Sequence, residues 1–101
     1  MQTINPRQLE AEVLNRLLAL PEVLQAGFHP RAGLTGAGVT VMKGRSFFGS
    51  WRVSHGALVW NYAHGGGTNY FAHSIDDAVR HTLMLILRTL ELERYERTNV
   101  A

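Results

Sequence analysis

Histidine and carboxylate side chains gather around the predicted start of the last helix. Asp77 and His81 are spaced i, i+4 and share a helix face. His73 precedes that helix, and His64 ends a predicted strand. Together these side chains have the donor atoms of a zinc site. However, the HExxH spacing is missing, and an Asp–His pair at i, i+4 is commonly a surface ion pair. We therefore predict no functional metal.

Two other patterns in the same segment suggest catalysis or phosphate binding. Ser74 lies between His73 and Asp77, which are the residue types of a nucleophile, a base and an orienting carboxylate. Ser74 is better explained as a helix cap. Gly65 to Gly67 follow a predicted strand, but the next helix begins later and opens with two aspartates, which would repel a phosphate. The sequence therefore predicts no enzyme and no cofactor.

Charge is distributed unevenly along the chain. Ten basic and eight acidic residues give a formal net charge of +2. Residues 23–75 contain no Asp or Glu, whereas four of the five histidines lie there. An acid-free centre favours an anionic partner. The basic residues that would contact such a partner are Arg31, Lys43, Arg45 and Arg52.

Composition is that of an ordinary globular protein. The 101 residues are 46% hydrophobic and 18% charged, which predicts one domain over residues 1–101. Cysteine is absent, so disulfides and thiolate metal sites are excluded. The longest apolar run, Leu83 to Leu87, is far too short to cross a bilayer, and residues 1–15 have no signal-peptide pattern. We expect a cytoplasmic protein; its nine arginines against one lysine indicate a GC-rich, bacterial genome.

One helix is predicted near each end of the chain. Asn5 and Pro6 are typical of a helix start, and apolar residues then recur at helical spacing as far as Leu20. Ser74 is the predicted cap of the last helix, which should run to about Arg94. These two helices must position whatever the central segment carries.

Strand patterns fill most of that central segment. The predicted strands are residues 39–43, 47–54 and 57–64. Gly44-Arg45 and His55-Gly56 are typical two-residue hairpin turns, while residues 28–38 and 65–73 have the composition of loops. The sequence therefore predicts an α+β fold in the order α-β-β-β-α, with a three-stranded antiparallel sheet packed with two helices.

The His55-Gly56 turn also predicts the strand register, with Trp51 opposite Trp60. Side chains alternate between the two faces of a strand. The predicted core face carries Phe47, Trp51, Val53, Leu58, Trp60 and Tyr62. The predicted reverse face carries Val39, Val41, Phe48, Ser50, Arg52, Val59, Asn61 and Ala63.

Apolar side chains exceed what one small core can cover. The reverse face is half apolar, and the apolar arc of the last helix extends to Leu87, with Met84 beyond it. We therefore predict a non-enzymatic protein-interaction domain, a self-associating regulator or inhibitor of another protein, whose partner is that protein, a second copy in a homodimer, or both. Its predicted contact residues are Val41, Phe48, Arg52, Val59, Met84 and Leu87.

The alternative function is nucleic-acid binding by the basic central region. Lysine and arginine would contact phosphates, and exposed aromatic rings would stack on bases. The candidate rings are Phe48, Tyr70 and Phe71.

Overall fold

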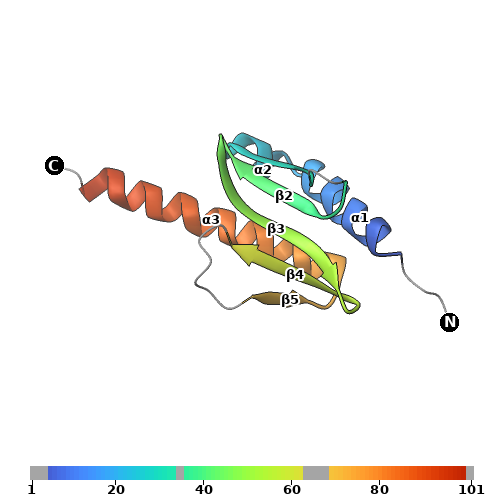
Figure 1. Cartoon of the computed structure of the whole chain (residues 1–101). Helices are drawn as coiled ribbons and strands as arrows, with labels where there is room; N and C mark the ends of the chain where they lie inside the picture. The colour runs from blue at the N-terminus through green and yellow to red at the C-terminus, as the bar shows by residue number, and fades with distance from the viewer. Residues whose placement is uncertain (1–4, 34–35, 63–68, 100–101) are drawn as a thin grey trace.

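The computed structural model describes residues 5–33, 36–62 and 69–99. The helices are α1 (Pro6–Leu18), α2 (Pro21–Gln25) and α3 (Ile75–Asn99). The strands are β1 (Phe28–Ala32), β2 (Val39–Lys43), β3 (Ser46–Ser54), β4 (Ala57–Tyr62) and β5 (Tyr70–Ala72). They form one antiparallel sheet in the order β1-β2-β3-β4-β5 (Figure 1). The predicted α+β class is confirmed, but the sheet has five strands, not three.

The two additional strands lie at the edges of the sheet. β1 includes Pro30, which has no N–H to donate; an edge strand tolerates this because one of its sides has no partner strand. β5 has only three residues, too few to show alternation in the sequence. Both segments were predicted as loops for these reasons.

The predicted helix starts are confirmed in detail. The Arg7 backbone N–H donates to Asn5 Oδ1 at 3.0 Å, and Pro6 occupies the first helical position of α1. The Asp77 backbone N–H donates to Ser74 Oγ at 3.0 Å, so Ser74 caps α3. α3 continues past its predicted end to Asn99.

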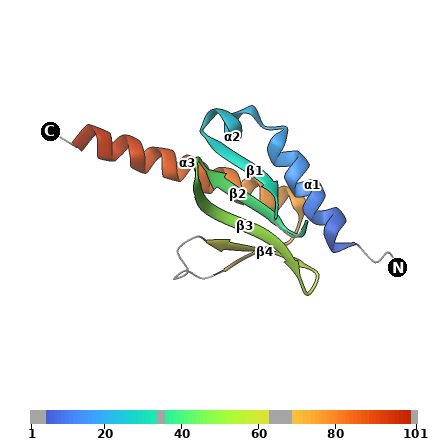
Figure 2. The same ribbon diagram turned by 45° about the horizontal axis from the view of Figure 1, so that its top comes forward.

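α1 and α3 cover the same face of the sheet. Val13 and Leu17 of α1 and Ile86 of α3 belong to one buried cluster that also contains Trp51 and Trp60. Figure 1 shows both helices behind the sheet, and Figure 2 shows the C-terminal end of α3 extending past it. The opposite face of the sheet is therefore left without a helix from the described residues.

Two tryptophans form the centre of the core. Trp51 and Trp60 lie opposite each other on β3 and β4, as predicted, with ring centroids 5.2 Å apart, and both are fully buried. The Trp51 indole N–H donates to Thr82 Oγ1 at 2.7 Å, and the Thr82 hydroxyl donates to the Ala78 carbonyl oxygen at 2.8 Å. This short chain of hydrogen bonds satisfies an indole N–H that would be costly to bury alone.

A β-bulge changes which side chains of β3 face the core. Val41 pairs with Gly49, but the next residue of β2, Met42, pairs with Phe47, so Phe48 is an extra residue on β3. Phe48 consequently packs against Phe28, with ring centroids 4.9 Å apart, whereas Phe47 is 42% exposed. The predicted faces of these two phenylalanines were therefore wrong.

The same bulge explains why the two valines of β2 lie on another face of the sheet than the sequence predicts. Without a bulge, the Gly44-Arg45 turn would place Val41 opposite Phe48; the shift places Val41 opposite Gly49 and Val39 opposite Trp51. Both valines lie in the core, and Val41 is fully buried. Their predicted location on the reverse face was wrong.

Candidate functional site

The face of the sheet that lies away from α1 and α3 carries a mixed set of side chains, here called the open face. Its members follow from strand alternation and register. The open face includes His29 and Arg31 on β1, Thr40 and Met42 on β2, Phe47, Ser50 and Arg52 on β3, Val59 and Asn61 on β4, and Phe71 on β5.

The strand pairing arranges the open face in three rows across the sheet. One row contains His29, Met42 and Phe47; a second contains Arg31, Thr40, Ser50 and Asn61; a third contains Arg52, Val59 and Phe71. The two arginines therefore occupy neighbouring rows, and the two exposed phenylalanines occupy the outer rows.

A depression of about 350 Å³ lies in this face. Its side-chain lining includes Arg31, Thr40, Met42, Phe47, Ser50 and Arg52, and Gly33 and Gly38 also line it. This volume is within the range of small-ligand sites. The lining combines two guanidinium groups, two hydroxyls and one aromatic ring, which suits a ligand with anionic and flat apolar parts.

Among the described residues, no Asp or Glu forms an ion pair with the arginines of the open face. Arg31 and Arg52 are exposed, and neither takes part in the ion pairs found among the described residues. The strands themselves contain no Asp or Glu. The buried acid Glu10, on α1, accepts hydrogen bonds from the backbone N–H groups of Gly38 (2.8 Å) and Val53 (3.0 Å). Its carboxylate oxygens are thus engaged by the backbone from the helix side.

The predicted basic residues separate into two groups. Arg31 and Arg52 line the same depression. Lys43 instead forms an ion pair with Glu93 of α3, and its ammonium lies 5.7 Å from the centre of the Phe28 ring. Arg45 is exposed at the β2–β3 turn. Lys43 therefore contributes little free charge to an anionic ligand.

The predicted protein-contact residues do not form one surface. Val41 is in the core, Phe48 packs against it, and Val59 is only 7% exposed although it lies on the predicted face between Arg52 and Phe71. Arg52 is on the open face, whereas the exposed side chains of Met84 and Leu87 belong to α3. Strand alternation alone missed Phe47, because no pattern in the sequence marks the bulge.

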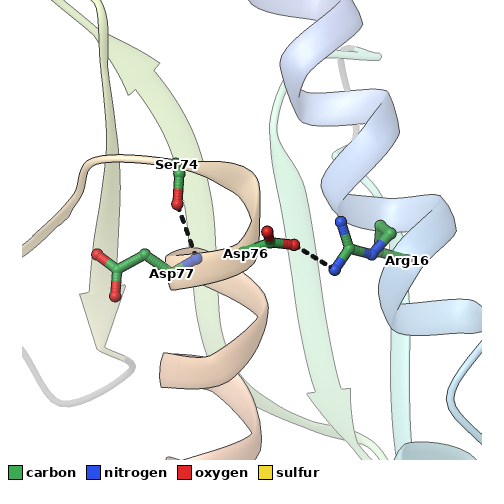
Figure 3. Close-up of polar contacts among 4 residues, drawn as sticks. All are labelled: Arg16, Ser74, Asp76 and Asp77. Carbon is green, nitrogen blue, oxygen red and sulfur yellow. Dashed lines mark hydrogen bonds and ion pairs between the residues drawn. The ribbon is translucent and has the colours of Figure 1, made fainter.

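The polar residues around Ser74 have structural roles. Ser74 Oγ accepts the Asp77 backbone N–H, while Asp76 forms an ion pair with Arg16 of α1 (Figure 3). The Asp77 carboxylate accepts hydrogen bonds from the Tyr70 hydroxyl, at 2.9 and 3.0 Å, and from the His73 backbone N–H at 3.2 Å. Ser74 is therefore positioned as a cap.

The candidate metal and phosphate residues are only partly described. His64 and Gly65–Gly67 lie outside the described residues. Within the part of the chain that is described, no group of three or more His, Cys, Asp or Glu side chains can hold a metal ion. His81 is buried against Tyr70, with ring centroids 3.8 Å apart and nearly parallel planes.

Packing shifts the pKa values of Tyr70, Asp77 and His81 in different directions. The hydrogen bond to Asp77 raises the pKa of the Tyr70 hydroxyl, because it stabilises the protonated phenol. The same bond lowers the pKa of the Asp77 carboxyl. Burial lowers the pKa of His81, although the charge of Asp77 partly opposes this shift and that of Arg88 adds to it. His81 is therefore held neutral in the folded protein near neutral pH.

The free energy of unfolding should fall as the pH drops below about 6.5, the unfolded pKa of histidine. Below that pH, His81 is protonated in the unfolded chain but still neutral in the folded protein. Stability is therefore lost as the pH falls, until it reaches the lowered pKa of His81 in the folded protein. Urea unfolding at a series of pH values measures this loss. His81→Phe, which keeps a flat ring on Tyr70, should flatten the profile just below about pH 6.5. If the His81→Phe variant kept the wild-type dependence of stability on pH, His81 would not be the cause of the loss. Asp77 contributes to the pH dependence only at lower pH, because its pKa is lowered.

Comparison of the chain with protein-family models, with curated sequences and with solved structures finds no match. Among the described residues, no helix has the length and apolar character needed to cross a membrane.

Proposed function

We propose that this protein is a non-enzymatic nucleic-acid-binding protein that uses the open face of its sheet. The observation that carries the proposal is the placement of Arg31 and Arg52, exposed and without ion-pair partners among the described residues, around one depression on an acid-free sheet. The burial of Val41, Phe48 and Val59 weakens the argument for a broad apolar docking surface there. A nucleic-acid ligand agrees with the cytoplasmic location expected from the sequence.

Phosphate contacts would supply most of the binding free energy. Each phosphate neutralised by an arginine or lysine releases condensed counterions, so affinity falls as the salt concentration rises. Arg31 and Arg52 lie in adjacent rows of the sheet and offer two such contacts, and Arg45 at the β2–β3 turn offers a third. With so few contacts, the salt dependence should be shallow and the affinity moderate.

Alanine at Arg31 or Arg52 should weaken DNA binding uniformly across sequences and reduce the slope of log affinity against log salt by about 1 for each residue. Fluorescence anisotropy with a labelled oligonucleotide, titrated between about 50 and 200 mM salt, measures both quantities.

Arg7→Ala is the matched control, because it removes the same charge from an exposed position on α1, in the layer opposite the open face. Equal losses from Arg7→Ala and Arg52→Ala would mean that net charge, and not the open face, determines binding. Absence of any binding at low salt would refute the proposed function.

A second candidate is self-association through α3. Met84 and Leu87 were predicted contact residues and are 48% and 58% exposed, and Leu92 and Tyr95 farther along the helix are also exposed. The end of this helix extends past the sheet, where a second copy can reach it (Figure 2). Sedimentation equilibrium tests this candidate: a dimer dissociated by Leu87→Asp supports it, and a monomer at all concentrations refutes it.

A further inference from the structure

We infer that the ligand is single-stranded nucleic acid, and that Phe47 and Phe71 stack on its bases while Arg31 and Arg52 contact its phosphates. This inference rests on the proposed function and specifies the class of ligand. It depends on the position of two exposed rings relative to the two free arginines on the open face.

Among the aromatic side chains of the sheet that the structure describes, these two rings are the most exposed. Phe28 is buried, Phe48 packs against the core, and both tryptophans are fully buried. By contrast, Phe47 is 42% and Phe71 is 55% exposed. Phe47 is exposed because the bulge at Phe48 turns it away from the core, so a local departure from regular pairing creates this aromatic position.

The second ring lies on the same face, on the edge strand β5. Phe71 pairs with Val59, which pairs with Arg52, so Phe71 stands in the same row as that arginine. Val59 lies between them in this row and is 7% exposed. Phe71 therefore has a guanidinium group two strands away, and Phe47 lines the depression that both arginines line.

The span between the rings suits an extended strand. Phe47 and Phe71 stand in rows that are four residues apart along the strands, and two strand spacings separate them across the sheet, so their α-carbons are roughly 16 Å apart. The row of Arg31 crosses the sheet between their two rows. A single strand of several nucleotides can follow the arginines and turn one base onto each ring.

A double helix fits this arrangement poorly. Its bases already stack on one another, and proteins read their edges with a helix or ribbon that enters a groove. Single strands present free base faces, and stacking on aromatic rings tolerates any base. The open face presents isolated rings and no protruding helix among its described elements, so it should favour single strands.

The experiment compares three labelled probes of about 20 nucleotides at one salt concentration: oligothymidine, an abasic oligomer with the same phosphates, and a duplex. Fluorescence anisotropy measures the affinity for each probe. We expect oligothymidine to bind about a hundredfold more tightly than the abasic oligomer, because only the former offers bases for stacking and each of the two rings contributes about tenfold. Oligothymidine should also bind more tightly than the duplex.

Phe47→Ala and Phe71→Ala should each lower the affinity for oligothymidine about tenfold and leave the affinity for the abasic oligomer unchanged. Phe71→Trp, which keeps a stacking surface, should retain wild-type affinity. Tyr95→Ala removes an exposed ring from α3, away from the open face, and should have no effect on any probe. Urea midpoints of the variants confirm that each is folded.

The possible failures separate this inference from the proposed function. Equal affinity for all three probes, with losses only in the Arg31 and Arg52 variants, overturns base stacking and leaves phosphate binding intact. If the Phe47→Ala and Phe71→Ala variants bound oligothymidine with wild-type affinity, base stacking would likewise be overturned and phosphate binding left intact. No affinity for any probe at low salt overturns both proposals.

Discussion

Trp51→Ala should lower the free energy of unfolding by about 3–5 kcal/mol, from lost burial and the cavity left behind. Trp51 is fully buried, contacts the Trp60 ring and lies within 6.4 Å of the Tyr70 ring centre. Its indole N–H also donates a hydrogen bond to the Thr82 hydroxyl oxygen. A small protein has about 5–15 kcal/mol of total stability, so this variant should lose a large fraction of it.

Urea unfolding followed by circular dichroism measures this effect. Trp51→Phe keeps part of the ring and removes the hydrogen bond to Thr82, so its midpoint should lie between those of the wild type and Trp51→Ala. Tyr95→Ala, at a position that is 68% exposed, should change stability by less than about 0.5 kcal/mol. A wild-type midpoint for Trp51→Ala would show that the Trp51–Trp60 pair is not the centre of the core.

Gly49→Ala should destabilise the fold by about 3 kcal/mol, near the upper end for overpacking. A β-carbon at Gly49 would lie 2.1 Å from Trp60 Cζ2 and 2.5 Å from Cη2. The Trp60 ring is fully buried, so it cannot move away into solvent. The cost therefore arises from lack of space above the indole. Urea midpoints give the magnitude.

A double-mutant cycle separates this collision from other effects. In a Trp60→Ala background the added methyl group no longer meets the indole, so Gly49→Ala should cost much less there. Ser50→Ala, one residue along on the open face, is the control for a methyl-sized change in β3. Equal costs of Gly49→Ala in the two backgrounds would exclude contact with Trp60 as the cause.

The elements with strong local patterns were predictable from the sequence. Asn5, Pro6 and Ser74 mark helix starts because their side chains or ring satisfy the geometry of a first turn. His55 and Gly56 both have positive φ, as the predicted two-residue turn requires, and the register from Ser54↔Ala57 to Gly49↔Tyr62 follows. These signals act over a few residues, so the sequence alone can show them.

The open face was less predictable because it depends on one bulge and two edge strands. Alternation assigns Phe47 to the core, and only the extra residue at Phe48 reverses this. Arg31 lies in a segment that Pro30 and its neighbouring glycines made look like a loop. The positions of Phe47 and Arg31 depend on pairing between strands, and no local sequence pattern encodes that pairing. The basic character of the region was nevertheless evident from the lack of acids in residues 23–75.

The two borders of the sheet also bear on how the protein behaves at high concentration. An edge strand with unpaired backbone N–H and C=O groups can pair with strands of other chains and so promote fibril formation. Here one border strand contains Pro30, which lacks a donor, and the other, β5, has only three residues. Both borders are poor templates for such growth. We therefore expect the open face to stay exposed at high concentration without its bordering strands promoting amyloid-like polymerisation.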